Sequence, residues 1–111
     1  MASRRKEHQE DAKFRLFQII TENPQLTTRE IAQKVGISNG SAYYLLTSLI
    51  DMGFVKLSNF KDSSQKIKYS YFLTPKGIRE KSSVTSKFLV RKKQEYERLK
   101  KEISELERDL S

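Results

Sequence analysis

The segment from residue 26 to residue 77 constrains the fold of this chain more than any other. It holds two short stretches with helical spacing, each followed by a glycine, and then two short stretches with strand spacing. Thr27 and Glu30 have the spacing of a capping box, in which the threonine hydroxyl and the glutamate carboxylate each accept a hydrogen bond from the other residue's backbone amide. Gly36 can end this helix in a left-handed conformation. The sequence therefore predicts a short, sharply bounded helix that begins at Thr27.

A further helix and a hairpin are predicted after Gly36. Ser38 is the expected N-terminal cap, and the helix should run to about Met52, before Gly53. Apolar residues at intervals of three and four predict its buried stripe: Ala42, Leu45, Leu46, Leu49 and Met52. Residues 54–60 and 66–73 are expected to be strands, joined by the polar tip K-D-S-S-Q. This order of elements predicts a mainly α fold with a small β-hairpin, a winged helix-turn-helix.

Longer helices are predicted on both sides of this segment. The first should cover about residues 7–22 and end at Asn23-Pro24, because proline disfavours helix in the residue before it. Its inner side should carry Phe14, Leu16, Phe17, Ile19 and Ile20. The last opens at Thr74-Pro75 and should continue to near Leu110. We therefore expect a winged helix-turn-helix domain at residues 7–88 and a dimerising coiled-coil helix at residues 89–111.

The coiled coil is predicted from a heptad pattern in the last helix. Its expected dimerisation residues are Leu89, Tyr96, Leu99, Ile103, Leu106 and Leu110, with Lys92 at the remaining core position. Isoleucine at one core position and leucine at the other favour a coiled coil of two parallel helices. The flanking charges do not fix the orientation, because in a parallel pair Glu95 faces Lys100 but Glu102 faces Glu107. Packing of the seam against the chain's own first helix is the competing arrangement.

The charge of the chain favours a nucleic-acid partner. Of the net charge of +8, residues 1–88 carry +7 (15 basic and 8 acidic residues), and residues 89–111 carry +1 (7 and 6). A basic globular part is typical of nucleic-acid binding. Arg4, Arg5 and Lys6 could contact phosphates, or could belong to a solvated, frayed terminus.

Several classes of function find no support in the sequence. The chain has no cysteine and one histidine, His8, so thiol chemistry, a zinc-thiolate site and a histidine-based triad or metal site are not expected. All four glycines are interpreted as helix stops or turn elements, which leaves no phosphate-binding loop. No apolar run approaches the length of a membrane span, and the charged N-terminus is unlike a secretory signal. We therefore expect a cytoplasmic protein that is not an enzyme and has no cofactor or metal.

The helix that begins after Ser38 is the expected DNA-reading element. Its candidate residues are Ser38, Asn39, Gly40, Ser41, Tyr43, Tyr44 and Thr47. Asn39 can pair bidentately with adenine, and Gly40 allows close approach of the groove. One of the two tyrosines could instead pack under the hairpin. The helix has no arginine or lysine, so arginine–guanine pairing is not expected from it.

The hairpin is predicted to be the wing, with Lys61, Lys66 and Lys68 as its DNA-binding residues. A basic hairpin beside a recognition helix can reach phosphates or the minor groove. Lysines on an exposed strand can also serve to prevent pairing with other chains. The two roles are compatible.

Residues 26–56, read as L-T-T-R-E-I-A-Q-K-V-G-I-S-N-G-S-A-Y-Y-L-L-T-S-L-I-D-M-G-F-V-K, resemble the MarR-type winged-helix regulators. The hairpin N-F-K-D-S-S-Q-K-I-K-Y-S-Y-F-L-T-P-K-G-I and the heptads that follow are similar to small members of that family associated with bacterial exopolysaccharide genes. The resemblance covers about residues 12–108. It implies sequence-specific binding to double-stranded DNA as a homodimer and control of nearby polysaccharide genes, with residues 38–47 for recognition and residues 61–68 as the wing.

The chain also departs from the longer MarR proteins. It lacks their additional dimerisation region and their wing arginine, so release of DNA by small phenolic ligands is not implied, and no effector is specified. We expect a transcriptional regulator. The alternatives are a winged-helix module that binds another protein and a nonspecific architectural DNA-binding protein.

Overall fold

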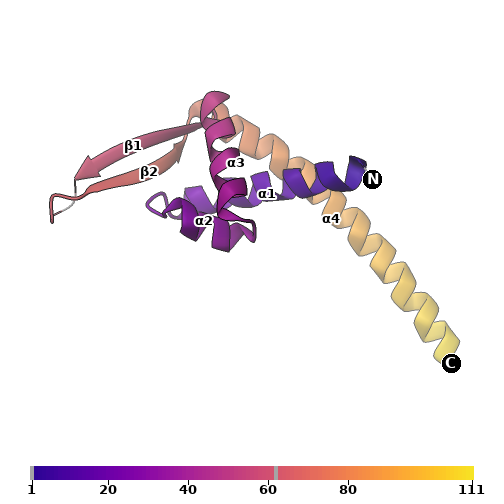
Figure 1. Ribbon diagram of the computed structural model, residues 1–111. Helices are drawn as coiled ribbons and strands as arrows, with labels where there is room; N and C mark the ends of the chain where they lie inside the picture. The colour runs from indigo at the N-terminus through magenta and orange to yellow at the C-terminus, as the bar shows by residue number, and fades with distance from the viewer. Residues whose placement is uncertain (1, 62) are drawn as a thin grey trace.

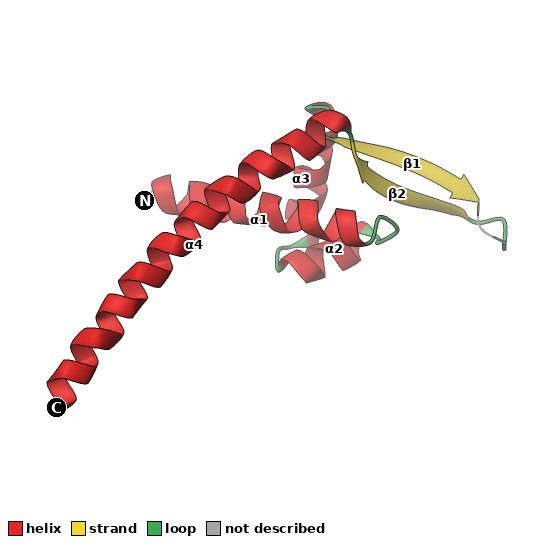
Figure 2. Cartoon of the chain, turned by 180° about the vertical axis from the view of Figure 1, so that it is seen from behind, coloured by secondary structure: helices red, strands yellow, loops and turns green. Residues whose placement is uncertain are grey.

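A computed structural model describes residues 2–61 and 63–111. Its elements, in chain order, are the helices α1 (Ala2–Glu22), α2 (Thr28–Val35) and α3 (Asn39–Asp51), the strands β1 (Val55–Lys61) and β2 (Ile67–Leu73), and the helix α4 (Pro75–Leu110). The first three helices form the body of the molecule, the hairpin projects from one side, and α4 crosses α1 and extends away from the body (Figures 1 and 2). The molecule is consequently elongated, with extents of 68 × 27 × 24 Å. The predicted mainly α winged helix-turn-helix is confirmed.

The predicted capping box at the start of α2 is present. The Glu30 amide donates to the Thr27 hydroxyl at 3.1 Å, and the Thr27 amide donates to the Glu30 carboxylate at 3.1 Å. Gly36 ends the helix in the left-handed region, with φ of 85°, and its amide donates to the Ala32 carbonyl. These local bonds fix where the helix-turn-helix begins and turns.

The capping box predicts a pH dependence that can be measured at one residue. Hydrogen bonds from the Thr27 backbone and hydroxyl lower the pKa of Glu30. A carboxyl group with a lowered pKa stabilises the fold above its unfolded-state pKa, and this contribution is lost as the pH falls through the lowered value. Thr27→Ala removes the hydroxyl but keeps the backbone amide, which is the larger cause, so in an NMR titration the Glu30 pKa should rise only part of the way to its ordinary value. The lost cap should cost about 1 kcal/mol of stability near neutral pH. A Glu30 pKa at its ordinary value in the wild-type chain would contradict the assignment.

The core lies where α1, α2, α3 and the base of the hairpin meet. Leu16, Phe17 and Ile20 of α1 are buried, as predicted. The predicted stripe of α3 is correct at three positions (Ala42, Leu46 and Leu49), while Leu45 is partly buried. The prediction that Met52 belongs to the buried stripe is wrong, because Met52 caps the C-terminus of α3 and 45% of its surface is exposed. The chain turns there before the stripe can continue.

The hairpin is an antiparallel pair whose register runs from Val55 opposite Leu73 to Lys61 opposite Ile67. The observed strands differ from the predicted ranges by one residue at three of the four ends. Tyr71 anchors the hairpin to the body: its amide donates to the Pro24 carbonyl at 2.9 Å, and its hydroxyl shares a hydrogen bond of 3.1 Å with the Thr28 hydroxyl. The base of the wing is thereby fixed against the start of α2.

The start of α4 is held tightly against the residue that precedes β1. The Thr74 hydroxyl caps the helix by accepting a bond from the Gly77 amide at 2.9 Å. A Cβ atom at Gly77 would lie 1.9 Å from the Phe54 carbonyl oxygen. Gly77 is the third residue of α4 and Gly40 the second residue of α3, so both lie in the first turn of a helix, in agreement with the sequence. The close approach of Gly77 to Phe54 is the feature that the sequence does not indicate.

Helix α4 is docked on α1 over its first half. The rings of Phe14 and Phe88 stack with centroids 4.2 Å apart. Arg91 donates to Glu10 at 2.7 Å and also pairs with Asp11. Every residue after Arg91 is exposed, and the C-terminal part of α4 extends away from the body (Figure 2). The predicted boundary between residues 88 and 89 thus falls within one continuous helix, and the division into two domains stays a prediction.

Helix α1 begins at Ala2 rather than near residue 7. The side chains of Arg4, Arg5 and Lys6 lie outside the described residues. In the part of the chain that the structure describes, no helix is long and apolar enough to span a membrane. The same residues contain no group of three or more histidine or acidic side chains that could hold a metal ion.

Candidate nucleic-acid interface

Helix α3 presents both of its tyrosines to solvent. The exposed fractions of Tyr43 and Tyr44 are 67% and 75%. The alternative in which one of them packs under the hairpin is therefore wrong. Since Ala42, Leu46 and Leu49 fix the opposite side of the helix in the core, the two rings are held on a rigid support. Both are available for contact with a partner.

The predicted residues of the first turn of α3 have distinct structural roles. The Ser38 hydroxyl accepts a bond from the Ser41 amide at 3.1 Å and donates to the Ser41 hydroxyl at 2.9 Å. Ser38 is therefore occupied as the helix cap, and Ser41 keeps its own hydroxyl proton for another acceptor. Asn39 and Gly40 are exposed, and a Cβ atom at Gly40 would meet nothing within 4 Å. Packing within the chain does not require a glycine at that position.

Thr47 is the last predicted residue of this surface. Its hydroxyl donates to the Tyr43 carbonyl at 2.8 Å. The proton is thus used within the helix, and Thr47 offers an outside partner only a hydroxyl lone pair and a methyl group. A methyl group suits apolar contact with thymine. The role of hydrogen-bond donor falls to Asn39, Ser41 and the tyrosines.

The wing places three predicted lysines on different parts of the hairpin. Lys61 is the last residue of β1, Lys66 lies at the tip, and Lys68 is in β2; all three are exposed. The hairpin projects from the C-terminal end of α3, because β1 follows that helix after a short turn (Figure 1). Helix α3 and the basic hairpin are therefore neighbouring elements of the fold.

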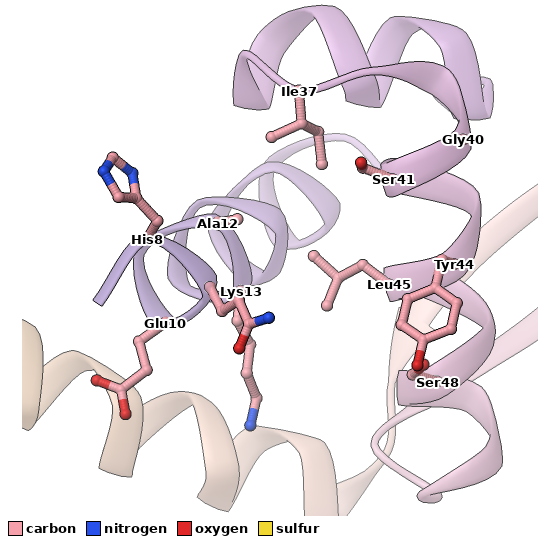
Figure 3. Close-up of a pocket in the computed structure, with 11 residues that line it drawn as sticks. His8, Glu10, Ala12, Lys13, Ile37, Gly40, Ser41, Tyr44, Leu45 and Ser48 are labelled. Carbon is pink, nitrogen blue, oxygen red and sulfur yellow. The ribbon is translucent and has the colours of Figure 1, made fainter. Parts of the chain in front are cut away.

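A groove of about 820 Å³ separates the N-terminal half of α1 from α3. Ala12, Ile37 and Leu45 line its apolar part, and Ser41 and Tyr44 stand at the side formed by α3 (Figure 3). The groove was not anticipated from the sequence, because it depends on how two helices far apart in the chain are placed. No local motif signals such an arrangement.

The predicted dimerisation residues form an uncovered stripe on α4. All six are exposed, from 47% for Ile103 to 89% for Leu110. Helix α1 packs against α4 through Phe88 and Arg91, not through this stripe. The alternative of a seam closed against the chain's own first helix is therefore wrong for the described residues.

Comparisons with known proteins agree with this geometry. Residues 9–56 match the family described as winged helix-turn-helix DNA-binding. None of the curated proteins compared with the chain matches it in sequence. A PadR-like transcriptional regulator from Bacillus cereus has a similar structure, with a TM-score of 0.69 and 17% identity over 78% of this chain and 89% of that protein.

Two further solved structures have a similar fold. A MarR family transcriptional regulator from Silicibacter pomeroyi has a TM-score of 0.57 and 22% identity, covering 74% of this chain and 52% of that protein. A variant of MepR from S. aureus has a TM-score of 0.60 and 18% identity, covering 100% of this chain and 94% of that protein. At these identities the similarity concerns the fold. Residues 9–56 match a winged helix-turn-helix DNA-binding family, and the chain shares its fold with solved MarR- and PadR-type transcriptional regulators.

Proposed function

We propose that this chain is a sequence-specific transcriptional regulator that binds double-stranded DNA as a homodimer. The observation that carries the proposal is the rigid, exposed face of α3, where Asn39, Ser41, Tyr43 and Tyr44 stand free of the core. A helix of this size fits the major groove of B-DNA, and amide, hydroxyl and aromatic groups can read base edges and thymine methyl groups there. The winged helix-turn-helix match supports the same role.

The wing would supply the charge that α3 lacks. Helix α3 contains no basic residue, whereas the hairpin carries Lys56, Lys61, Lys66 and Lys68. Phosphate contacts fix the position of a protein on DNA, and base contacts give specificity. In this proposal the two tasks are divided between the hairpin and the helix.

Dimerisation would compensate for the small number of side chains with which one chain can contact DNA bases. The uncovered stripe on α4 is apolar in an otherwise charged segment, the pattern of a coiled-coil seam. Because α4 is continuous from the winged helix to Leu110, pairing of two seams would hold two recognition helices in a fixed relation. Such dimers read half-sites about 34–36 Å apart on near-palindromic DNA.

The resemblance of the hairpin and heptads to exopolysaccharide-associated regulators motivates a proposal for the targets. We propose polysaccharide genes, or other genes next to the chain's own, as the regulated set, with the protein acting in the cytoplasm. The DNA upstream of its own operon is then the first probe.

A binding experiment across a salt series separates this proposal from its alternatives. We expect the full chain to bind its upstream DNA more tightly than a scrambled duplex of the same length at each salt concentration. Equal binding to both, with one steep salt dependence, would instead indicate a nonspecific architectural protein. Absence of binding would favour a protein-interaction module.

Tyr44→Ala should weaken specific binding by roughly ten- to a hundredfold, in the range for loss of one good base or groove contact. Tyr44 is 75% exposed, so the melting temperature should not change. Tyr44→Phe separates the hydroxyl from the ring, because it removes only the former. Titration of each variant with the upstream duplex measures the effect, and unchanged affinity of the alanine variant would remove Tyr44 from the site.

A further inference from the structure

Arg91 is the last residue of α4 that is held against the body of the molecule. Its guanidinium binds the carboxylates of Glu10 and Asp11 on α1, and every later residue of α4 is exposed. Only 22% of the Arg91 side chain is exposed, so these ion pairs are partly shielded from water and salt. Arg91 therefore marks the point where α4 changes from a docked to an undocked helix.

The contacts of Arg91 fix its orientation as well as its position. Its Nη1 donates to Glu10 at 2.7 Å, and its Nη2 donates to Asp11. A planar guanidinium held at two nitrogens cannot turn without losing a bond, whereas an ammonium group can. Arg91 also lies over the ring of Phe88, at 5.7 Å from its centroid, and this ring stacks on Phe14 of α1. We call these five residues the interhelix clamp.

The interhelix clamp is rigidly connected to the DNA-reading helix. Leu16, Phe17 and Ile20 of α1 belong to the same buried cluster as Leu46 and Leu49 of α3. Because protein interiors are close-packed, the two helices cannot move separately without opening this core. The direction in which α4 leaves α1 is therefore also its direction relative to α3.

The uncovered apolar stripe of α4 begins at the clamp. Leu89 lies between Phe88 and Arg91 in the sequence, but it is 51% exposed, on a different side of the helix from the residues that contact α1. The stripe continues to Leu110 on the same continuous helix. In a dimer joined along this stripe, the clamp determines the distance and the angle between the two α3 helices.

We propose that Arg91 is a positioning residue that selects the half-site spacing at which the dimer binds DNA. The inference rests on the proposed function and assigns the choice of spacing to side chains outside α3 and the wing. One base pair changes the separation of two half-sites by about 3.4 Å and their relative rotation by about 34°. A closed clamp holds the two α3 helices in one arrangement, so both bind fully at one spacing only.

Opening the clamp should leave the fold and the dimer in place. Nearer its start, α4 stays attached through the buried Val84 and through the close contact of Gly77 with Phe54. The stripe is not part of the clamp. What is lost is the fixed direction of the helix beyond its attachment, and with it the preference for one spacing.

A set of duplexes that differ in spacing tests the inference. Footprinting of the full chain on its upstream DNA first identifies the two half-sites. These half-sites are then placed at their native spacing and with one or two base pairs inserted or removed. The affinity of the full chain for each duplex gives a spacing profile, and sedimentation verifies that each variant is a dimer.

The wild-type chain should lose roughly tenfold or more in affinity when one base pair is inserted or removed, because the second half-site is then poorly engaged. Arg91→Met keeps an apolar stem but opens the clamp, and its loss should be less than about threefold. Arg91→Lys should also flatten the profile, since one ammonium group cannot hold both carboxylates in a fixed plane. This variant separates position from charge, because lysine would fully replace an arginine that only attracted phosphates.

Lys87→Met is the matched control. It removes one positive charge from an exposed residue one turn earlier on α4, outside the clamp and the predicted seam. Its spacing profile should stay as steep as that of the wild-type chain. If Arg91→Met does not fold or is monomeric, Glu10→Gln combined with Asp11→Asn opens the clamp from α1 and should flatten the profile in the same way.

Several results would overturn the inference while leaving the proposed function intact. They are a steep profile for a folded, dimeric protein with an opened clamp, a wild-type profile for Arg91→Lys, an equally flattened profile for Lys87→Met, and a flat profile for the wild-type chain on its specific DNA. If the wild-type chain does not prefer its upstream DNA to scrambled DNA, the proposed function itself fails, and the inference fails with it.

Discussion

Gly77→Ala is expected to destabilise the protein by about 3 kcal/mol, at the upper end of the cost of overpacking. The added Cβ atom would lie 1.9 Å from the Phe54 carbonyl oxygen and 2.8 Å from its carbonyl carbon. Both are backbone atoms, so no side-chain rotation can relieve the clash. The gain of about 1 kcal/mol in helix propensity from glycine to alanine is too small to compensate.

Gly40→Ala is the matched control for this prediction. It makes the same chemical change inside a helix, but its Cβ atom would meet nothing within 4 Å. The control should therefore gain roughly 0.5–1 kcal/mol. Urea unfolding measures the free energy of unfolding of both variants. The protein concentration is kept the same, because the stability of a dimer depends on concentration. Equal stability of the two variants would contradict the close packing of α4 on Phe54.

Ile103→Asp is expected to convert the protein to a monomer and to lower its affinity for specific DNA roughly a hundredfold or more, because linked binding of two half-sites commonly contributes 10²–10⁴. Ile103 is at the centre of the exposed stripe of α4, and a carboxylate there would be buried without a partner in the dimer. The winged helix should remain folded, since Phe88 and Arg91 hold α4 to α1 independently of the stripe.

Ser104→Asp provides the control for Ile103→Asp. It adds the same charge one residue further along the same helix, outside the predicted seam. Sedimentation analysis should find this variant dimeric and Ile103→Asp monomeric. A dimeric Ile103→Asp protein, with DNA affinity like that of the control, would exclude the seam as the dimer interface.

The features that could be predicted from the sequence are those whose interactions are local. The capping box joins residues three apart, Gly36 ends α2 through a bond to Ala32, and Thr74 caps α4 three residues on. Each depends on residue types at fixed short spacing, so each can be recognised in a single sequence. The boundaries of α2, α3 and the start of α4 follow from them.

The features that were missed join residues far apart in the chain. Gly77 is constrained by Phe54, Arg91 pairs with Glu10 and Asp11, and Tyr71 is anchored at Thr28. The spacing of apolar residues along the sequence does not indicate which helices will pack together or at what distance. For the same reason the close approach of Gly77 to the Phe54 backbone cannot be predicted from the sequence.

In the candidate site, too, local features can be predicted from the sequence and long-range features cannot. The exposed face of α3 follows from its buried stripe, because one side of a helix determines the other. The exposure of the outer part of the hairpin does not follow in this way, because alternation in β2 indicates which residues share a face but not how far the core extends along that face. The burial of Val55 and the exposure of Ile67 had to come from the structure.

A hydroxyl-radical footprint of the full chain on its own upstream DNA tests the central claim most directly. A dimer that reads DNA with two α3 helices should protect two patches whose centres lie about 34–36 Å, or roughly 10 base pairs, apart on one face of the duplex. The same protein should give no localised protection on a scrambled duplex. A single protected patch, or uniform weak protection of both duplexes, would contradict a dimeric, sequence-specific regulator.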